Sequence, residues 1–150
     1  GISHALQQAE HIVNNEKLLF VLGDNFFEKN PIESFDLDEF KEGAYIFTKS
    51  VDNPIEFGVA LMVIEGNVIS IEEKPEIPKS NNAVVGAYMF DESVFEMIST
   101  LQPSKRGEYE ITDLCNLYVN NKKCKNFSID GWWIDAGTPE RIIELEEKLG

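Results

Sequence analysis

Cysteine and histidine are scarce in this chain of 150 residues. The two cysteines, Cys115 and Cys124, lie nine positions apart, and no second pair of metal ligands accompanies them, which argues against a zinc site. We interpret them as reduced cytosolic thiols, half buried in a helix and a strand. The two histidines, His4 and His11, have no partner in the sequence that would give them a role.

Long apolar runs and positive charges are also lacking. No run is long enough to cross a bilayer, and no basic-then-apolar leader opens the sequence, so we expect a cytoplasmic protein with no membrane partner. Lys and Arg number 13 against 27 Asp and Glu, and the formal charge of -14 makes nucleic acid a poor partner. The sequence has no internal repeat, and its 43% of hydrophobic residues suffices for the core of one domain or of part of a larger one.

The most informative stretch is LLFVLGDNFF, residues 18–27. Its apolar run without polar alternation predicts a strand buried on both faces, which stops at Gly23, where the backbone turns at no steric cost. Ligands of open α/β sheets sit outside the carboxyl ends of the strands, so Asp24 stands where a metal or a polyphosphate is expected. The alternative is that Asp24 and Asn25 simply form a turn.

The rest of the sequence alternates between helix and strand patterns. A helix is expected over residues 1–14, with Ser3 as its cap, and others over 91–99, over 109–120 and from Pro139 onward, with Thr138 as cap. Strands are expected over residues 43–50, 57–64, 68–73, 83–90 and 124–129, and the second and third of these form a hairpin. This alternation predicts a mixed α/β sheet.

Asp135 repeats the arrangement seen at Asp24. It follows an apolar Trp-Trp-Ile segment and precedes a Gly-Thr turn at the start of the last helix. Two carboxylates at strand ends suit Mg²⁺, which takes few protein carboxylates and completes its octahedron with water and substrate phosphates. The alternative is that Asp135 only caps the final helix, because the two aspartates lie more than a hundred residues apart.

Two charged segments are candidates for binding a sugar phosphate. Lys74 could place its ammonium on a phosphate, and Glu73 could accept hydrogen bonds from two sugar hydroxyls. A surface ion pair is the alternative for these two residues. Arg106 lies in a loop beside a glycine and could reach a phosphate with two hydrogen bonds, and Glu108 also fits as an acid in the first turn of a helix.

Gly58 and Gly86 interrupt two of the predicted strands. Glycine inside a strand often marks the close approach of a ligand to the backbone, although a bulge explains it equally well. Both glycines are therefore candidates for the lining of a binding pocket.

Five motifs occur in order along the chain: VLGDN, EFGV, EEKPEIPKSNNAVVGAYMFD, RGEYEITD and GWWIDAGTPE. Together they resemble the sugar-1-phosphate nucleotidyltransferases over nearly the whole chain, most of all the glucose-1-phosphate thymidylyltransferases of dTDP-rhamnose synthesis. The resemblance implies a three-layer α/β fold of the Rossmann-like nucleotide-diphospho-sugar transferase type, with a mixed, mostly parallel sheet and helices on both faces. It also implies Mg²⁺ as cofactor, and glucose 1-phosphate with dTTP or UTP as substrates.

The same resemblance implies a reaction and roles for single residues. The sugar phosphate attacks the α-phosphorus of the nucleoside triphosphate in line, and pyrophosphate leaves. By motif match, Asp24 and Asp135 would be the catalytic pair that holds Mg²⁺, Glu73 would bind sugar hydroxyls, and Lys74 and Arg106 would bind the sugar phosphate. The other expected substrate-binding residues are Gly1, near the nucleotide base, and Gly58, Val84, Gly86, Tyr88 and Glu108.

The sequence departs from this family in two segments, because it has neither the family's glycine-rich loop nor the Lys-Pro segment that follows that loop. The family has a glycine-rich loop of the type GGxGTRLxPxT, which cradles the triphosphate on backbone N–H groups, and no such segment occurs here. We therefore expect residues 1–150 to be the C-terminal portion of a catalytic domain that is incomplete at its N-terminus and inactive alone. An uncovered apolar sheet edge would favour self-association, and we expect a homo-oligomer.

Two other interpretations stay open. A sugar-phosphate-binding or regulatory subunit would keep Glu73, Lys74 and Arg106 but would not need Asp24 and Asp135. A glycosyltransferase also brings carboxylates, a metal and a sugar nucleotide to a sheet edge. A glycosyltransferase is expected to have an Asp-x-Asp pair after a strand, where this chain has Gly-Asp-Asn.

Overall fold

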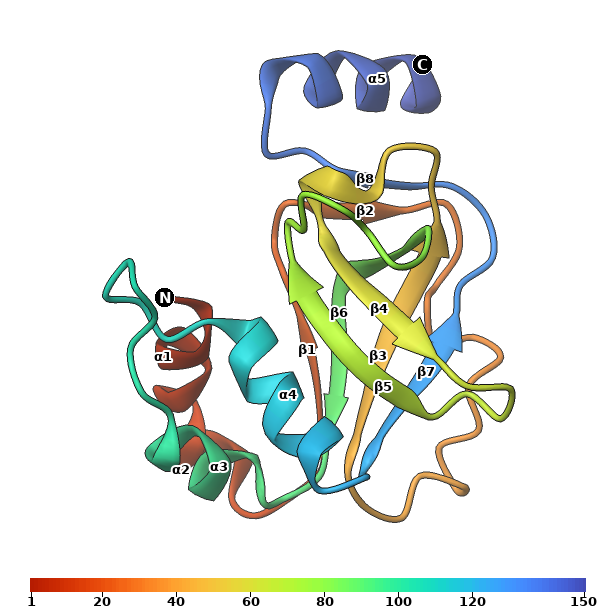
Figure 1. Ribbon diagram of the computed structural model, residues 1–150. Helices are drawn as coiled ribbons and strands as arrows, with labels where there is room; N and C mark the ends of the chain where they lie inside the picture. Colours follow the sequence, from red (N-terminus) through yellow and green to blue (C-terminus); the bar gives the residue numbers. More distant parts are fainter.

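A six-stranded sheet forms the centre of the computed structural model, which describes all 150 residues (Figure 1). Its strands are β1 Leu18–Val21, β3 Ala44–Ser50, β4 Gly58–Met62, β5 Val68–Glu73, β6 Asn82–Phe90 and β7 Cys124–Ser128. A small second sheet pairs β2 Asn25–Phe27 with β8 Trp133–Asp135. The helices are α1 Ile2–Gln7, α2 Glu10–Val13, α3 Val94–Thr100, α4 Ile111–Asn120 and α5 Pro139–Leu149, with a 3-10 turn η1 over Pro54–Glu56. None of the helices is long and apolar enough to cross a membrane.

β6 lies at the middle of the large sheet and sets its topology. The order is β5-β4-β6-β3-β7, and β1 pairs with the C-terminal half of β6. β1, β3 and β4 are each antiparallel to β6, and β7 is parallel to β3, so these four strands point the same way. The expected mixed α/β sheet is confirmed. Most hydrogen-bonded neighbours are nevertheless antiparallel, because β6 lies between strands that point the other way and β4 and β5 form a hairpin.

The side chains of β6 alternate between two cores, one on each face of the sheet. Tyr88 and Phe90 belong to a cluster of 18 buried residues that also includes apolar side chains of α1, α3 and α4. Val85, Ala87 and Met89 belong to a second cluster of 7 buried residues. This strand, rather than β1, is the one buried on both faces.

The second core is covered by an irregular segment, residues 28–43, and not by a helix. Phe35 packs edge-on against Tyr45 of β3 with ring centroids 4.8 Å apart. The side chains of Asn30 and Asp36 each accept a hydrogen bond from a backbone N–H two residues on, which favours turns over a helix. The expected helices on both faces are therefore wrong for these residues: α1, α3 and α4 cover one face, and α5 lies beyond β8 (Figure 1).

β1 also differs from its prediction, because only one of its faces is buried. Leu18 and Phe20 pack on the larger core, whereas Leu19 and Val21 are 38% and 43% exposed. β1 bonds to β6 alone, so its other edge has no partner strand. Self-association through this edge stays a prediction.

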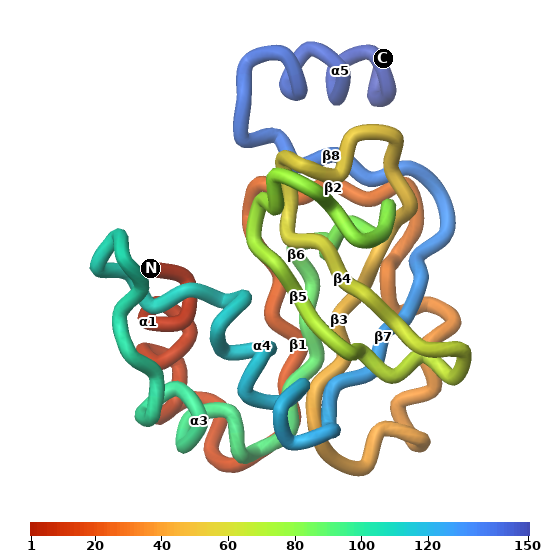
Figure 2. The backbone as a smooth tube through the Cα atoms, in the orientation of Figure 1, coloured from red at the N-terminus to blue at the C-terminus, as the bar shows by residue number.

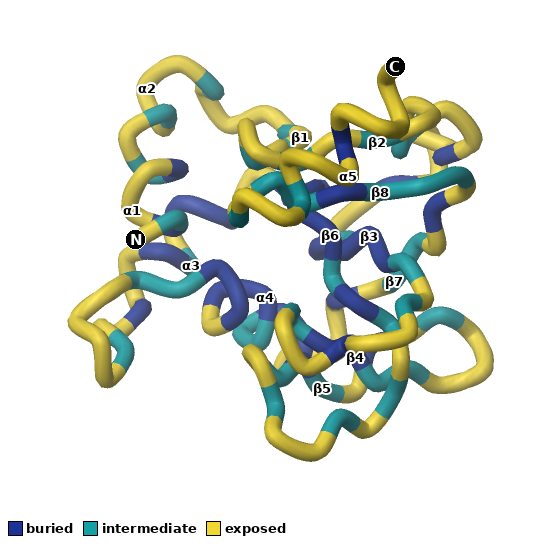
Figure 3. The backbone as a smooth tube through the Cα atoms, turned by 90° about the horizontal axis from the view of Figure 1, so that it is seen from above, coloured by how far each residue is buried: buried dark blue, intermediate teal, exposed yellow.

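The N-terminal helix is shorter than expected, since a turn separates α1 from α2. The red tube in Figure 2 follows this part of the chain from the N-terminus. Ser3 does not cap α1; its hydroxyl donates instead to the carbonyl of Glu110 at 3.0 Å. Cys115 of α4 and Cys124 of β7 are free and fully buried, not half buried. Seen from above, α4, β3 and β6 are mostly buried, whereas α2 and α5 are largely exposed (Figure 3).

Candidate active site

A cleft of about 350 Å³ lies where the small β2–β8 sheet meets β4, β5 and β6 and the start of α4. Eight of the predicted site residues line it: Asp24, Gly58, Glu73, Lys74, Val84, Gly86, Tyr88 and Asp135. Five further lining residues matter for its geometry: Asn25, Phe57, Thr112, Trp133 and Arg141. The fold therefore brings residues from five separate strands to one concave site, which is the usual setting of a small-molecule pocket.

The two aspartates, far apart in sequence, are neighbours in the fold. Asn25 stands opposite Asp135 in the β2–β8 ladder, and the carbonyl of Asp24 accepts a hydrogen bond from the N–H of Ala136 at 2.8 Å. Asp135 Oδ1 accepts from the N–H of Gly137 at 3.0 Å, and its Oδ2 lies 3.8 Å from the guanidinium of Arg141. Asp24 lies exposed in the turn just before β2, and Asp135 is half-buried at the end of β8. Two carboxylates placed this way fit a Mg²⁺ ion that takes its other ligands from water and phosphate.

Asn25 organises the turn that carries Asp24. Its Oδ1 accepts hydrogen bonds from the N–H of Gly86 at 2.8 Å and from the indole Nε1 of Trp133 at 2.7 Å. Its Nδ2 donates to Asp24 Oδ1 at 3.0 Å. Because the Gly86 and Trp133 groups can only donate, the amide oxygen must face them, and the amide nitrogen must face the carboxylate.

Gly86 was expected to admit a ligand close to the backbone. In the structure it admits the side chain of Asn25, since a Cβ at position 86 would lie 2.5 Å from Asn25 Cγ. Both peptide groups of Gly86 bond to the same turn, because its carbonyl also accepts from the N–H of Leu22 at 2.8 Å. The glycine is therefore required by packing within the protein.

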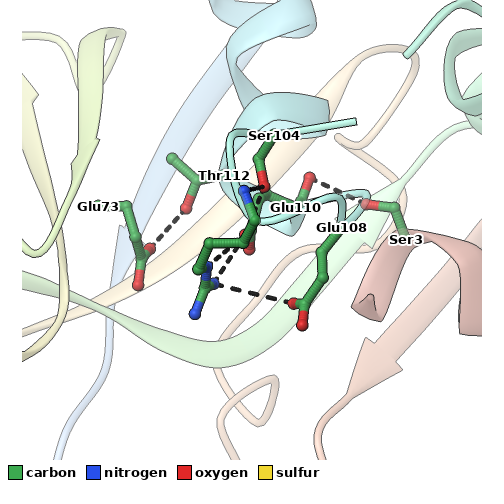
Figure 4. Close-up of polar contacts among 7 residues, drawn as sticks. Ser3, Glu73, Ser104, Glu108, Glu110 and Thr112 are labelled. Carbon is green, nitrogen blue, oxygen red and sulfur yellow. Dashed lines mark hydrogen bonds and ion pairs between the residues drawn. The ribbon is translucent and has the colours of Figure 1, made fainter. Parts of the chain in front are cut away.

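Glu73 lines the part of the cleft formed by β4, β5 and the start of α4. Thr112 Oγ1 donates to Glu73 Oε2 at 2.8 Å, which orients the carboxylate from the first turn of α4 (Figure 4). Gly58 lies opposite in the ladder, and a Cβ there would approach Glu73 Oε2 to 3.3 Å and Val84 Cβ to 3.7 Å. The absence of a side chain at position 58 thus keeps open the space beside Glu73.

Tyr88 closes the bottom of the cleft from β6. Burial raises the pKa of its phenol well above the usual value, and the nearby Cys115, Glu73 and Asp135 raise it further. Burial likewise raises the pKa of the Cys115 thiol. Tyr88 is therefore a neutral hydroxyl that can donate or accept a hydrogen bond, and Cys115 is an unreactive thiol.

Lys74 stands at the rim with an unusual backbone conformation. Its φ of +44° is rare for any residue other than glycine. Its N–H donates to the carbonyl of Phe57 at 3.0 Å. The following Pro75 ends the strand. Glu73 and Lys74 also line a second, polar pocket of about 430 Å³ on the side of residues 104–113.

Arg106 lines that second pocket and forms a salt bridge with Glu110. Its Nη2 donates to Glu110 Oε1 at 2.7 Å, and its Nε donates to the same oxygen at 3.2 Å. The hydrogen bond to Glu110 raises the pKa of Arg106, and the hydrogen bond from Arg106 lowers the pKa of Glu110. Glu108 lies 3.9 Å from the guanidinium, and Glu110 also accepts from Ser104 (Figure 4). The structure thus places Arg106 and Glu108 beside the cleft and not in its lining.

Arg141 ties α5 to the cleft. Its guanidinium lies over the ring of Phe57 at 4.6 Å and donates to Glu56 Oε2 at 2.9 Å. Phe57 also packs on Trp133, with ring centroids 5.0 Å apart. The predicted cap of α5 is confirmed, since Thr138 Oγ1 accepts from the Arg141 N–H at 3.4 Å.

Comparison with known proteins identifies the family. The family model described as nucleotidyl transferase matches residues 1–150. The chain belongs to the nucleotidyl transferase family. It is 38% identical over 151 residues to a low-salt glycan biosynthesis nucleotidyltransferase of Haloferax volcanii, an alignment that covers 98% of this chain and 42% of the relative. It is 35% identical over 152 residues to a glucose-1-phosphate thymidylyltransferase of Mycolicibacterium smegmatis, covering 98% and 52%.

A solved structure supports the nucleotidyl transferase fold. A Bacillus anthracis protein assigned as a glucose-1-phosphate thymidylyltransferase, solved in complex with a sucrose, superposes with a TM-score of 0.88 at 42% identity, covering 99% of this chain and 60% of that one. The predicted family and fold are thereby confirmed. The chain spans about half the length of the curated relatives it matches.

Gly1 is the third predicted residue outside the cleft of this nucleotidyl transferase chain. It packs against the backbone of Tyr109, and a Cβ would lie 2.6 Å from that carbonyl oxygen, although the adjacent Ile2 does line the cleft. The substrate roles of Gly1, Arg106 and Glu108 stay predictions. Thr112, Trp133 and Arg141 were missed because their signals, a helix start and a hydrophobic strand end, have ordinary structural explanations.

Proposed function

We propose that these residues form the sugar-phosphate and metal side of an enzyme that transfers a nucleotidyl group from dTTP, or UTP, to glucose 1-phosphate with release of pyrophosphate. The single observation that carries the proposal is the cleft itself, in which the Asp24–Asp135 pair stands beside Glu73 and Lys74. The names of relatives at 35% identity and of a structure at 42% identity support the sugar and the nucleotide.

The sugar end of the proposed site is built from Glu73 and the groups around it. Glu73 accepts hydrogen bonds from two sugar hydroxyls, while the Thr112 hydroxyl donates to its Oε2. Gly58 leaves room for the sugar ring. Tyr88 presents a neutral hydroxyl from below. Lys74 lines the same cleft as Glu73 and pairs with the sugar phosphate as a point charge.

The metal end of the proposed site is the aspartate pair. Asp24 and Asp135 would hold Mg²⁺, which supplies positive charge to the phosphates while the sugar phosphate oxygen displaces pyrophosphate in line. The chain contributes position and charge, since little covalent chemistry falls to the protein in such a transfer. Because the 150 residues include no glycine-rich loop for the triphosphate, we propose that they bind sugar phosphate without turnover on their own.

Isothermal titration of the chain with glucose 1-phosphate, with and without Mg²⁺, tests this function. We expect binding that Mg²⁺ strengthens and that Glu73→Gln weakens by about tenfold or more, because the carboxylate is the proposed acceptor of the sugar hydroxyls. Glu72→Gln is the matched control, since that neighbour on β5 points to the other face and pairs with Lys79.

Three outcomes would overturn the proposal. An affinity for glucose 1-phosphate that is the same with and without Mg²⁺ would favour a sugar-phosphate-binding subunit. Binding of dTTP or UTP without any binding of the sugar phosphate would favour a glycosyltransferase. An equal loss of affinity in Glu72→Gln and Glu73→Gln would place the sugar outside the cleft.

A further inference from the structure

Asn25 joins the two ends of the cleft. It lies at the start of β2, and its three side-chain hydrogen bonds reach Gly86 of β6, Trp133 of β8 and the carboxylate of Asp24. The large sheet and the β2–β8 sheet share few other polar links at this point. One half-buried amide therefore connects the strand that carries Val84 and Tyr88 to the carboxylate proposed to hold the metal.

The amide also acts where the backbone ladder stops. β1 ends at Val21, the N–H of Leu22 bonds to the carbonyl of Gly86, and the Asn25 N–H returns to the carbonyl of Leu22 at 3.2 Å. The next donor along β6, the N–H of Gly86, finds the Asn25 side chain in place of a strand carbonyl. The side chain thus extends the β1–β6 pairing by one bond and fixes the turn that contains Asp24.

We propose that Asn25 is a positioning residue that sets the Asp24 carboxylate for metal binding, with Gly86 as the site that admits it. The inference rests on the proposed function, because it assumes that Asp24 is a metal ligand. Asn25 itself donates to Asp24 Oδ1 and leaves Oδ2 for the ion, so it acts through the aspartate and not on the substrate.

The structure also predicts how Asn25 and Gly86 depend on each other. The Asn25 atoms nearest to a Cβ at position 86 are Cγ, Nδ2 and Oδ1, at 2.5–2.6 Å. Gly86→Ala must therefore displace the amide and with it Asp24. In Asn25→Ala these three atoms are gone, so the closest contacts that a Cβ at position 86 would meet are removed.

The test is the affinity of the chain for Mn²⁺, a spectroscopic substitute for Mg²⁺, measured by electron paramagnetic resonance. Loss of an outer-shell hydrogen bond to a metal ligand typically costs about 10–100-fold in affinity, which we expect for Asn25→Ala. We expect Gly86→Ala to lose a comparable factor, and the double variant to be no weaker than Asn25→Ala alone. Asn120→Ala, an exposed position at the end of α4, is the control and should bind as the unchanged chain does.

Circular dichroism and urea unfolding show whether each variant is folded. Unchanged Mn²⁺ affinity in folded Asn25→Ala, or losses that multiply in the double variant, would overturn the proposal. If Asn25→Ala does not fold, Gly86→Ala against the unchanged chain decides it. If the unchanged chain binds no Mn²⁺, the metal site of the proposed function is wrong. The order of the Asp24 side chain in crystals of the unchanged chain and of Asn25→Ala then decides the role of Asn25.

Discussion

Thr112→Val removes the hydroxyl that orients Glu73 while it leaves the shape of the side chain nearly unchanged. In the structure Thr112 is 9% exposed and donates to Glu73 Oε2 at 2.8 Å, whereas Glu73 is open to solvent. Water can replace the lost donor in the free protein. We therefore expect the free energy of unfolding to fall by less than about 1 kcal/mol.

The cost appears when a ligand covers Glu73 and excludes that water. A hydrogen bond to a charged group then contributes about 1–2 kcal/mol, which corresponds to a loss of about 5–30-fold in affinity for glucose 1-phosphate. Thr112→Ser keeps the hydroxyl and should stay within about threefold of the unchanged chain, because only a methyl group is lost.

Calorimetric titration of glucose 1-phosphate into the three proteins, with urea unfolding of each, separates the two effects. The reasoning is refuted if Thr112→Val binds as tightly as the unchanged chain. It is equally refuted if Thr112→Ser loses as much affinity as Thr112→Val, since the methyl contact and not the hydrogen bond would then matter.

Three further predictions concern stability. Asp91→Ala removes a buried carboxylate that accepts from a backbone N–H at 2.6 Å and from the Tyr118 hydroxyl at 3.1 Å, so urea unfolding should show a loss of about 3 kcal/mol or more; a loss below 1 kcal/mol would contradict this. Asn116→Ala deprives Ile71, on the edge strand β5, of two side-chain hydrogen bonds, and should cost about 1–2 kcal/mol and speed amide exchange at Ile71, whereas unchanged exchange would count against that role. Burial raises the pKa of Cys124 from 9.0 to about 12, so the unfolded chain loses this proton first, and this thiol should lower stability by up to about 1.4 kcal/mol per pH unit as pH rises from 9 to 12; Cys124→Ala should remove this share of the slope and leave that of the other buried groups with raised pKa, Cys115 and Tyr88, and an unaltered slope would refute the assignment.

Local signals were enough to predict many elements of this chain. The β4–β5 hairpin, the helix that begins at Pro139 behind Thr138, and the strand over β6 all follow from turn residues, caps and apolar runs within a few positions. The nearness of Asp24 and Asp135 was expected from the motifs, and the β2–β8 ladder delivers it.

The errors arise where the partner is distant in sequence. The apolar run of β1 predicts two buried faces, yet Leu19 and Val21 are exposed because burial depends on which segments lie across the sheet. A glycine inside a strand, such as Gly86, predicts the close approach of a ligand to the backbone. In the structure the group that approaches is the side chain of Asn25, 61 residues away. In the sequence Asn25 looks like an ordinary turn residue, and its hydrogen bond with Trp133 forms only in the folded chain.

The account depends on a metal ion and a sugar phosphate sharing one cleft. Crystals of the chain grown with glucose 1-phosphate and Mn²⁺, with data collected at the manganese edge, test this most directly. We predict an anomalous peak between the carboxylates of Asp24 and Asp135, with the sugar hydroxyls on Glu73 and the sugar phosphate beside Lys74. A manganese peak elsewhere on the protein, or a sugar bound away from Glu73, would contradict the account.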